Sequence, residues 1–229
     1  MMRLKLLSVI LAVFAVALPD AAQMGMGPRM PTLSGVWHPV VGSGAAYERT
    51  MTAEGDKTQM EITIVGKDDM AGKTGYWLEF AMSNAKMPGQ MLMKELMAVG
   101  DEGVTSTRLI MQPPGQQPME MDLNGNPMGK AMKQTTPADI RDKAEVVGTE
   151  SVAVPAGTFS CQHLRQKDGS SDVWISDKVS PWSLVKYQDS KSTMVLTKVI
   201  TDAKDRITGT PTKFDPMQMM RNHQGQQAQ

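Results

Sequence analysis

The sequence predicts a mainly β protein (α+β) built on an antiparallel meander, with one or two short helices. From residue 36 onward, short segments of alternating apolar and polar residues are separated by Gly, Pro, Asn and Asp. This is the pattern of half-buried strands joined by tight turns. Segments with helix signals are short and few. A chain of 229 residues is long enough for one core without a second full domain.

The alternation delimits two series of strands. The first series covers residues 47–52, 60–65, 76–82, 91–99, 104–112 and 118–123. The second series covers residues 145–154, 158–166, 172–176, 183–188 and 193–200. The intervening segments, including residues 66–74, are rich in turn residues and are predicted to be turns.

Helix signals occur in two places. Thr136 and Pro137 provide a cap and a first-turn proline for a helix over residues 137–144. Asp215 and Pro216 provide the same start for a helix over residues 215–221, and a polar, Gln-rich tail follows.

Residues 1–22 have the organisation of a secretory signal peptide. Arg3 and Lys5 precede an uncharged apolar run over residues 6–18, which is shorter than the roughly 18–20 residues that span a bilayer. The sequence does not decide between cleavage after Ala17 and cleavage a few residues later. We expect export to the periplasm or the medium, with no membrane span after cleavage. An uncleaved anchor is the alternative.

The remaining chain divides into a Gly- and Pro-rich flexible leader (23–35), a single sheet domain (36–210), and a short helix with a mobile tail (211–229). The single cysteine, Cys161, lies far from the cleavage region, so we expect a soluble protein without a lipid anchor. One cysteine also excludes a disulfide framework and a cysteine-rich zinc site.

Charge and motif content exclude several classes of function. The 24 Lys and Arg residues balance 24 Asp and Glu residues, whereas a nucleic-acid-binding protein normally has a basic excess. Neither G-x-S-x-G nor H-E-x-x-H occurs, and three histidines offer few general bases. We therefore expect no nucleic-acid partner, no enzymatic activity and no cofactor.

Two motifs resemble ligand loops but depart from them. The segment that begins at Gly66 has five residues before Gly72, where a phosphate-binding loop has four, and a strand-like segment follows it. Residues 122–126 have the alternate oxygen ligands that open a calcium loop. However, Pro127 replaces the required glycine and Lys133 replaces the required glutamate. Both segments are expected to be turns.

Cys161 and His163 are two residues apart on a predicted strand and therefore share a face with Phe159. A thiol and an imidazole in this arrangement can form a nucleophile–base pair or two metal ligands. The alternative is an apolar, buried face. We favour the buried face, because the nearby sequence contains no carboxylate or amide placed to orient the histidine.

Methionine is abundant, with 22 residues, and many lie at alternate positions of predicted strands. If the strands over residues 91–99, 104–112 and 118–123 are neighbours, their apolar side chains form one patch. The candidate residues are Met91, Met93, Met97, Leu109, Met111, Met119 and Met121. Such a patch is either an ordinary core face or a pliable apolar groove, because flexible methionine suits surfaces that accept varied apolar partners.

A second methionine pattern lies near the chain ends. Thioether sulfur is a soft ligand that selects Cu(I). The candidate copper ligands are Met24, Met26, Met30, Met217, Met219, Met220 and His223.

The stretch from Glu150 to Arg165, with its V-x-V-P-A-G-T-F turn, is followed by Asp172-Val-Trp-Ile-Ser-Asp177 and Ser183-Leu-Val-Lys-Tyr187. Together these residues resemble exported bacterial proteins of unknown function related to the LolA/LolB lipoprotein-carrier superfamily. The resemblance covers about residues 145–200. It implies a strongly curved antiparallel sheet, a LolA-like half-barrel, with an apolar concave surface that carriers of this kind use for acyl chains. No binding residue of the carriers can be matched to a position in this sequence.

The leading hypothesis is an exported, non-enzymatic binding protein with an apolar groove for a lipid, an acyl chain or a hydrophobic polypeptide segment. One alternative is a periplasmic Cu(I)-binding protein. Another is a structural envelope protein whose core is closed by its own elements.

Overall fold

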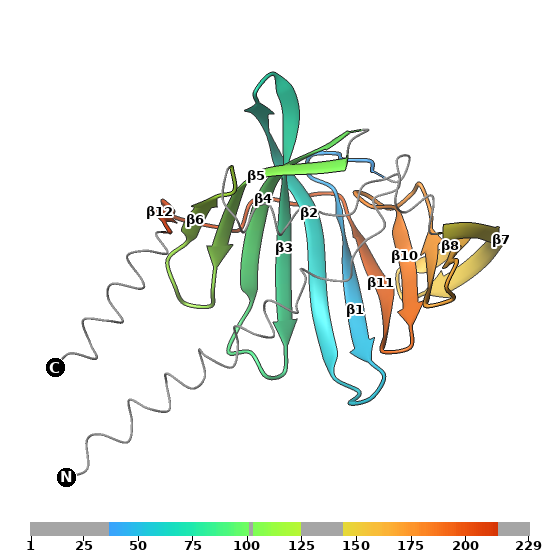
Figure 1. Ribbon diagram of the computed structural model, residues 1–229. Helices are drawn as coiled ribbons and strands as arrows, with labels where there is room; N and C mark the ends of the chain where they lie inside the picture. The colour runs from blue at the N-terminus through green and yellow to red at the C-terminus, as the bar shows by residue number, and fades with distance from the viewer. Residues whose placement is uncertain (1–36, 101–102, 125–143, 215–229) are drawn as a thin grey trace, which may run out of the picture. The chain divides into compact units, whose positions relative to one another are not determined.

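In the computed structural model, residues 37–100, 103–124 and 144–214 are described. They form one sheet of 12 strands, in the order β12-β6-β5-β4-β3-β2-β1-β11-β10-β9-β8-β7 (Figure 1). The strands are β1 (Gly44–Met51), β2 (Lys57–Met70), β3 (Lys73–Asn84), β4 (Met91–Gly100), β5 (Gly103–Gln112), β6 (Met119–Asp122), β7 (Ala144–Val154), β8 (Gly157–Gln166), β9 (Ser171–Ile175), β10 (Leu184–Asp189), β11 (Ser192–Ile200) and β12 (Thr212–Lys213).

The mainly β prediction is confirmed, and each predicted strand has its counterpart among β1 to β11. No helix occurs in the described residues. The helix predicted over 215–221 lies outside them. So does the helix predicted over 137–144, except for Ala144, which begins β7.

The sheet consists of two antiparallel meanders, β1 to β6 and β7 to β11, which join where β1 pairs with β11. This pairing links Tyr47 to Leu196, which are far apart in the sequence. Strand β12 pairs with β6 in parallel and extends the sheet past residue 210. It was not predicted, because two residues are too short to show alternation.

The prediction of a turn over residues 66–74 was wrong. Strands β2 and β3 continue through most of this segment, and only Ala71 and Gly72 form the turn between them. Both residues have positive φ, 54° and 82°, as a two-residue hairpin of type I′ requires. Polar residues such as Lys67 and Asp68 are exposed in this part of β2, so their polarity does not prevent pairing. The segment is not a phosphate loop, since a strand and not a helix follows it.

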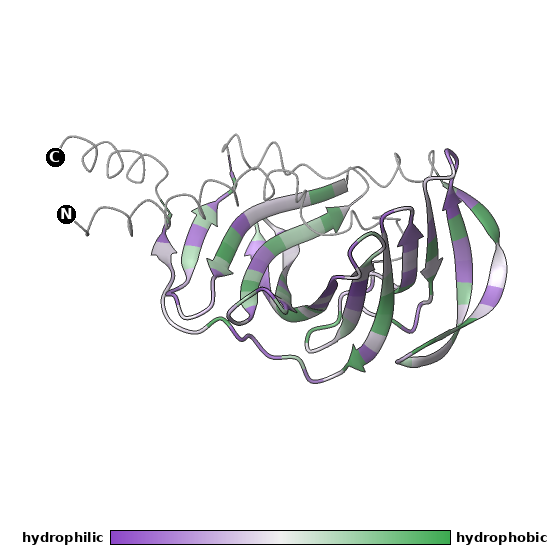
Figure 2. Ribbon diagram, turned by 90° about the horizontal axis from the view of Figure 1, so that it is seen from below, coloured by the Kyte–Doolittle hydropathy of each residue, from purple (hydrophilic) through white to green (hydrophobic). Residues whose placement is uncertain are grey.

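Several strands contain register shifts. In the first meander they occur between Ala46 and Tyr47, between Ile64 and Gly66, and between Leu96 and Met97. Such irregularities bend a strand and increase its twist. Strands bend along their length in Figure 2, which also shows the alternation of hydrophilic and hydrophobic residues.

The core lies where the two meanders meet. Tyr47 is fully buried, and its hydroxyl donates a hydrogen bond to the carbonyl oxygen of Leu184 at 3.1 Å. Burial raises the pKa of this phenol far above its ordinary range. Met194 and Leu196 of β11 and Ile62 of β2 are also buried almost completely.

The sheet belongs to the unit of residues 32–229. The predicted signal peptide and leader lie outside the described residues. Within the described ranges, no helix is long and apolar enough to cross a membrane.

Candidate functional site

The residues predicted to form an apolar groove lie on one side of the sheet. Register pairing aligns Phe80, Met93, Met111 and Met119 in one row across β3 to β6. Met82 pairs with Met91 beside this row. Paired residues, and residues two apart on a strand, share a face. We call the following set the methionine face: Phe80, Met82, Met91, Met93, Glu95, Met97, Leu109, Met111, Met119 and Met121.

Burial decreases along β4 on this face. Met97 and Glu95 are 1% and 2% exposed, whereas Met93 and Met91 are half-buried. Met97 pairs with Tyr76, whose ring contacts that of Trp37 at a centroid distance of 6.0 Å. Aromatic side chains therefore lie at the Met97 end, and the Met91 end is the accessible one.

Four of the predicted residues come together in one cluster. Leu109 and Met121 are buried with Leu123, and Met93 and Met111 pack against them while remaining partly exposed. Phe214, which follows β12, packs against the same cluster. Of the other three, Met119 pairs with Met111 and is half-buried. Met91 is half-buried too, and Met97 belongs to the core.

Glu95 is the one ionisable residue of the methionine face. It lies in the row of Leu78, Leu109 and Met121. Burial raises the pKa of its carboxyl group, and a hydrogen bond with Ser106 opposes that shift in part. The sequence places Glu95 among the methionines, but we did not select it as a site residue. A glutamate on an otherwise apolar strand face was the signal that could have identified it.

The opposite side of β2 to β4 is covered by the segment 201–211, which links β11 to β12 and which we call the strap. Arg206 of the strap bonds Glu79 twice, from its backbone nitrogen to Oε2 at 3.0 Å and from Nε to Oε1 at 2.7 Å. Its Nη1 donates to Oε2 of Glu61 at 2.7 Å. Asp205 pairs with Lys94. The strap is therefore fastened by charge to three successive strands.

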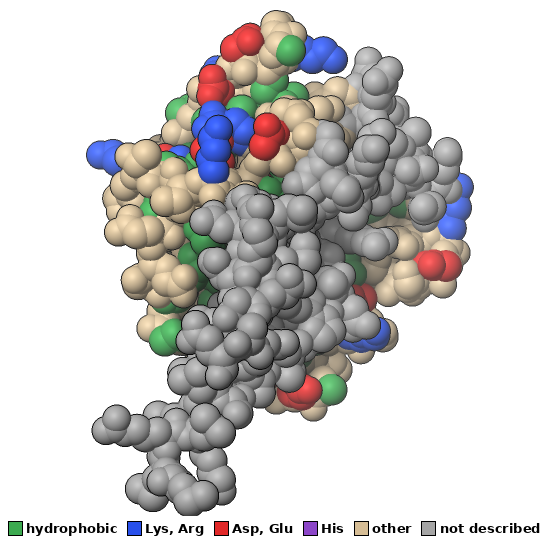
Figure 3. Space-filling model, turned by 60° about the vertical axis from the view of Figure 1, so that its left-hand side comes forward, with side chains coloured by type: hydrophobic (Ala, Val, Ile, Leu, Met, Phe, Trp, Pro, Cys, Tyr) green, Lys and Arg blue, Asp and Glu red, His purple; other side chains and the backbone are tan. Residues whose placement is uncertain are grey.

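Charges of both signs lie side by side on the molecular surface. In Figure 3, Lys and Arg side chains adjoin Asp and Glu side chains among patches of hydrophobic groups. Arg108 is one example, with Nε 2.7 Å from Oε1 of Glu120 and its guanidinium over the ring of Trp77. Paired charges of this kind hold neighbouring strands together and leave little net field.

His163 has two carboxylate partners that the sequence analysis missed. Its Nε2 lies 2.6 Å from Oδ1 of Asp172, and its Nδ1 lies 3.2 Å from Oε1 of Glu150. The ring stacks on Trp174 at 4.5 Å. These partners come from β9 and β7, so they are close only through strand pairing. The nearby sequence showed no such carboxylate because both partners lie on other strands.

The surroundings of Cys161 disfavour a nucleophilic thiolate. The residue is fully buried, and burial, together with the charge of Glu150, raises the pKa of its thiol to about 11. A thiol is a poor nucleophile in the protonated form that this pKa favours at neutral pH. Phe159 and His163 are also buried, which agrees with the buried face favoured from the sequence, but the carboxylates beside His163 mean that this face is not wholly apolar.

The candidate copper ligands (residues 24, 26, 30, 217, 219, 220 and 223) all lie outside the described residues. Within the described part of the chain, no group of three or more His, Cys, Asp or Glu residues is placed to hold a metal ion. The calcium-like segment begins as a turn, since Oδ1 of Asp122 accepts a hydrogen bond from the backbone nitrogen of Asn124 at 2.8 Å.

No family model matches the chain, and no curated protein matches it significantly. A "putative lipoprotein" from Parabacteroides distasonis is similar in structure, with 14% sequence identity and a TM-score of 0.34 over 72% of this chain and 97% of its own. A "putative exported protein with YmcC-like fold" from Bacteroides fragilis has 14% identity and a TM-score of 0.33 over 72% of this chain and 98% of its own. Likeness at this level assigns no family, and the LolA/LolB-like relationship stays a prediction.

Proposed function

We propose that the chain is an exported, non-enzymatic binding protein that holds a lipid acyl chain on the methionine face. The observation that carries the proposal is the row of Phe80, Met93, Met111 and Met119, whose half-buried side chains extend across four neighbouring strands. Met is unbranched and polarizable, so such a row adapts to a flexible guest. Each methylene group transferred from water contributes about 0.8 kcal/mol before ordering costs.

An acyl chain fits this face better than a polypeptide does. The backbone groups of β3, β4 and β5 are used in the ladders on both sides of each strand. A polypeptide lying on the face would leave its own N–H and C=O groups without partners, which is costly away from water. An acyl chain carries no such groups. The raised pKa of Glu95 also favours a neutral carboxyl beneath the face.

Fluorescent fatty-acid binding tests the proposal. The full chain is titrated with 11-(dansylamino)undecanoic acid, and we expect saturable binding with a blue-shifted emission. The double variant Met93→Gln/Met111→Gln adds two polar amides to the face and should weaken binding by about tenfold or more. Met87→Gln, a half-buried methionine in the β3–β4 loop, is the matched control and should bind as the parent does.

Two results would contradict the proposal. A chain that takes up no probe has a closed face, as expected of a structural envelope protein. Equal affinity of the parent, the double variant and the control would place the probe elsewhere. Circular dichroism confirms that each variant keeps its β signal.

A further inference from the structure

A second site lies away from the methionine face, beside β8 and β9. It is a pocket of about 300 Å³, which is at the small end of ligand-binding cavities. Its lining comes from four segments: the chain before β1, strand β8, the end of β9 with the turn that follows, and the residue before β10. The lining residues are His38, Ser160, Gln162, Ile175, Ser176, Asp177 and Ser183.

Hydrogen bonds of the main chain fix the walls of this pocket. The nitrogen of Ser176 donates to the carbonyl oxygen of Ser183 at 2.7 Å, and the nitrogen of Ser183 donates to that of Val179, also at 2.7 Å. The nitrogen of His38 donates to the carbonyl oxygen of Pro181 at 2.8 Å, and Oγ of Ser180 donates to the carbonyl oxygen of His38 at 2.8 Å. The loop between β9 and β10 therefore holds His38 in place.

Packing beneath this loop adds rigidity. Val179 is fully buried, and the ring of Trp182 contacts that of Trp37 at a centroid distance of 4.4 Å. A cavity whose walls are already ordered costs little conformational entropy when a ligand enters.

Ser183, one of the lining residues, has an unusual backbone conformation. Its φ is 57°, in the left-handed region that few residues other than glycine adopt. The side chain is 2% exposed and lines the pocket. Glycine would adopt this backbone without strain, whereas serine adopts it at an energetic cost. Strain of this kind concentrates at ligand sites.

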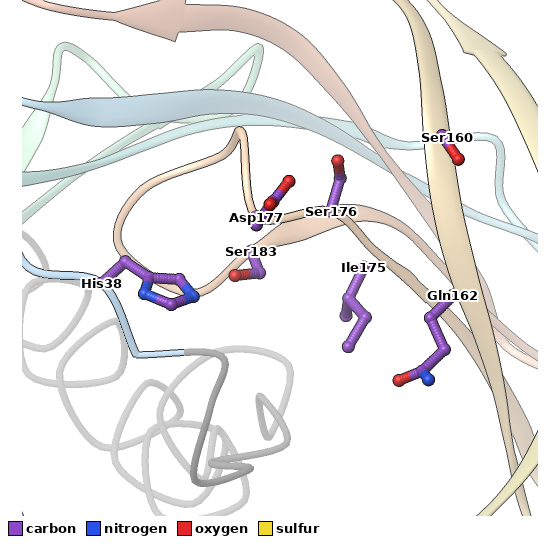
Figure 4. A pocket seen from close by; sticks show the side chains of 7 residues that line it. All are labelled: His38, Ser160, Gln162, Ile175, Ser176, Asp177 and Ser183. Atoms are coloured by element: carbon purple, nitrogen blue, oxygen red, sulfur yellow. The ribbon is translucent and has the colours of Figure 1, made fainter.

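The chemistry of the lining selects the ligand. Residues with hydroxyl, amide, imidazole and carboxylate groups line the pocket together with one apolar residue, Ile175 (Figure 4). His38 and Gln162 lie at opposite ends, with Ser183 and Ile175 between them. The lining contains no Lys or Arg, which disfavours phosphate and other anions, and it has too little apolar surface for an acyl chain. Mixed donors and acceptors around one apolar contact suit a neutral ring that bears several hydroxyl groups.

We propose that this pocket binds a small, neutral, polyhydroxylated molecule, of the size of one sugar ring. The site is separate from the methionine face and does not depend on the function proposed there. In Figure 4 the carboxylate of Asp177 points away from the ring of His38. The proposal for this pocket concerns binding alone.

Saturation-transfer difference NMR of the full chain tests the site, with glucose and N-acetylglucosamine as probes. We expect saturable binding with a dissociation constant in the millimolar range. Gln162→Ala and His38→Ala each remove one hydrogen-bonding group from an exposed side chain at the rim, and each should weaken binding by about threefold to tenfold. Gln188→Ala, an exposed glutamine on β10 outside the lining, is the matched control and should leave the affinity unchanged.

Three outcomes would overturn the assignment. The first is no saturable transfer to either probe at concentrations well above the millimolar range. The second is binding that Gln162→Ala and His38→Ala leave unchanged. The third is competition of either sugar by the dansyl fatty acid, which would merge this site with the methionine face. Sugar binding without fatty-acid binding would support this inference and contradict the function proposed above.

Discussion

The two sides of strands β2 to β4 are held in different ways. On the strap side, charged groups fix one segment to three strands, and Glu79 is fully buried beneath Arg206. On the methionine side, contacts are apolar and non-directional, and the rows of Met91 and Met93 remain half-buried. Directional charge pairs determine one arrangement, whereas flexible thioether side chains accept several. The comparison indicates that rigidity belongs to the strap side and adaptability to the methionine side.

The largest effect is expected where the strap is fastened. Arg206→Ala removes the guanidinium that pairs with the carboxylate of Glu79, which is 0% exposed, and keeps only the hydrogen bond from the backbone nitrogen of residue 206. Removing the charged partner of a buried carboxylate costs about 3–5 kcal/mol. Urea unfolding followed by tryptophan fluorescence measures the change. Lys57→Ala breaks an ion pair with Glu48 in which the lysine is 61% exposed, and such pairs contribute up to about 1 kcal/mol. If the two variants lose equal free energy of unfolding, the pair of Arg206 and Glu79 does not hold the strap.

A smaller effect separates core from surface within the methionine side. Met121 is 5% exposed and packs with Leu109 and Leu123, so Met121→Ala should cost about 2–5 kcal/mol. Met119 is half-buried two residues earlier on the same strand, and Met119→Ala should cost about 1 kcal/mol. The same urea titration provides both values. If Met119→Ala costs as much as Met121→Ala, the face is a closed core and offers no binding surface.

The sheet was largely predictable because alternation depends on local sequence. Most strands of the two meanders have an apolar side that the sequence shows directly, whereas β7 has no buried residue. The row of Met93, Met111 and Met119 forms because β4, β5 and β6 are neighbours, as the sequence analysis assumed. The exception was the β2–β3 hairpin, because Lys67 and Asp68 read as turn residues although they pair with β3. Exposed polar residues are tolerated in a strand that faces water, so polarity alone does not mark a turn.

The contacts between distant segments were not predictable. Asp172 and Glu150 meet His163 only because β7, β8 and β9 pair in a particular register. Arg206 reaches Glu79 and Glu61 only because the strap crosses back over the first meander. The polar pocket combines His38 with residues after 159 in the same way. A single sequence shows local periodicity, but it contains no direct signal for which strands become neighbours.

The last effect concerns the charge state of Glu95 and depends on pH. Because its pKa is raised in the folded state, the folded protein retains a proton that the unfolded chain releases near the ordinary value of 4.5. Between the ordinary pKa and the raised pKa of the folded state, the folded state binds more protons than the unfolded state. The free energy of unfolding therefore falls as pH rises through this window and then levels.

Glu95→Gln keeps a neutral side chain at every pH, so its stability relative to the parent should rise from pH 4 to pH 7. Glu145→Gln, on the exposed part of β7, is the control and should follow the parent throughout. Parallel stability curves for Glu95→Gln and the parent would mean that the carboxyl is charged beneath the methionine face, and a charged group there would weaken the case for an acyl chain above it.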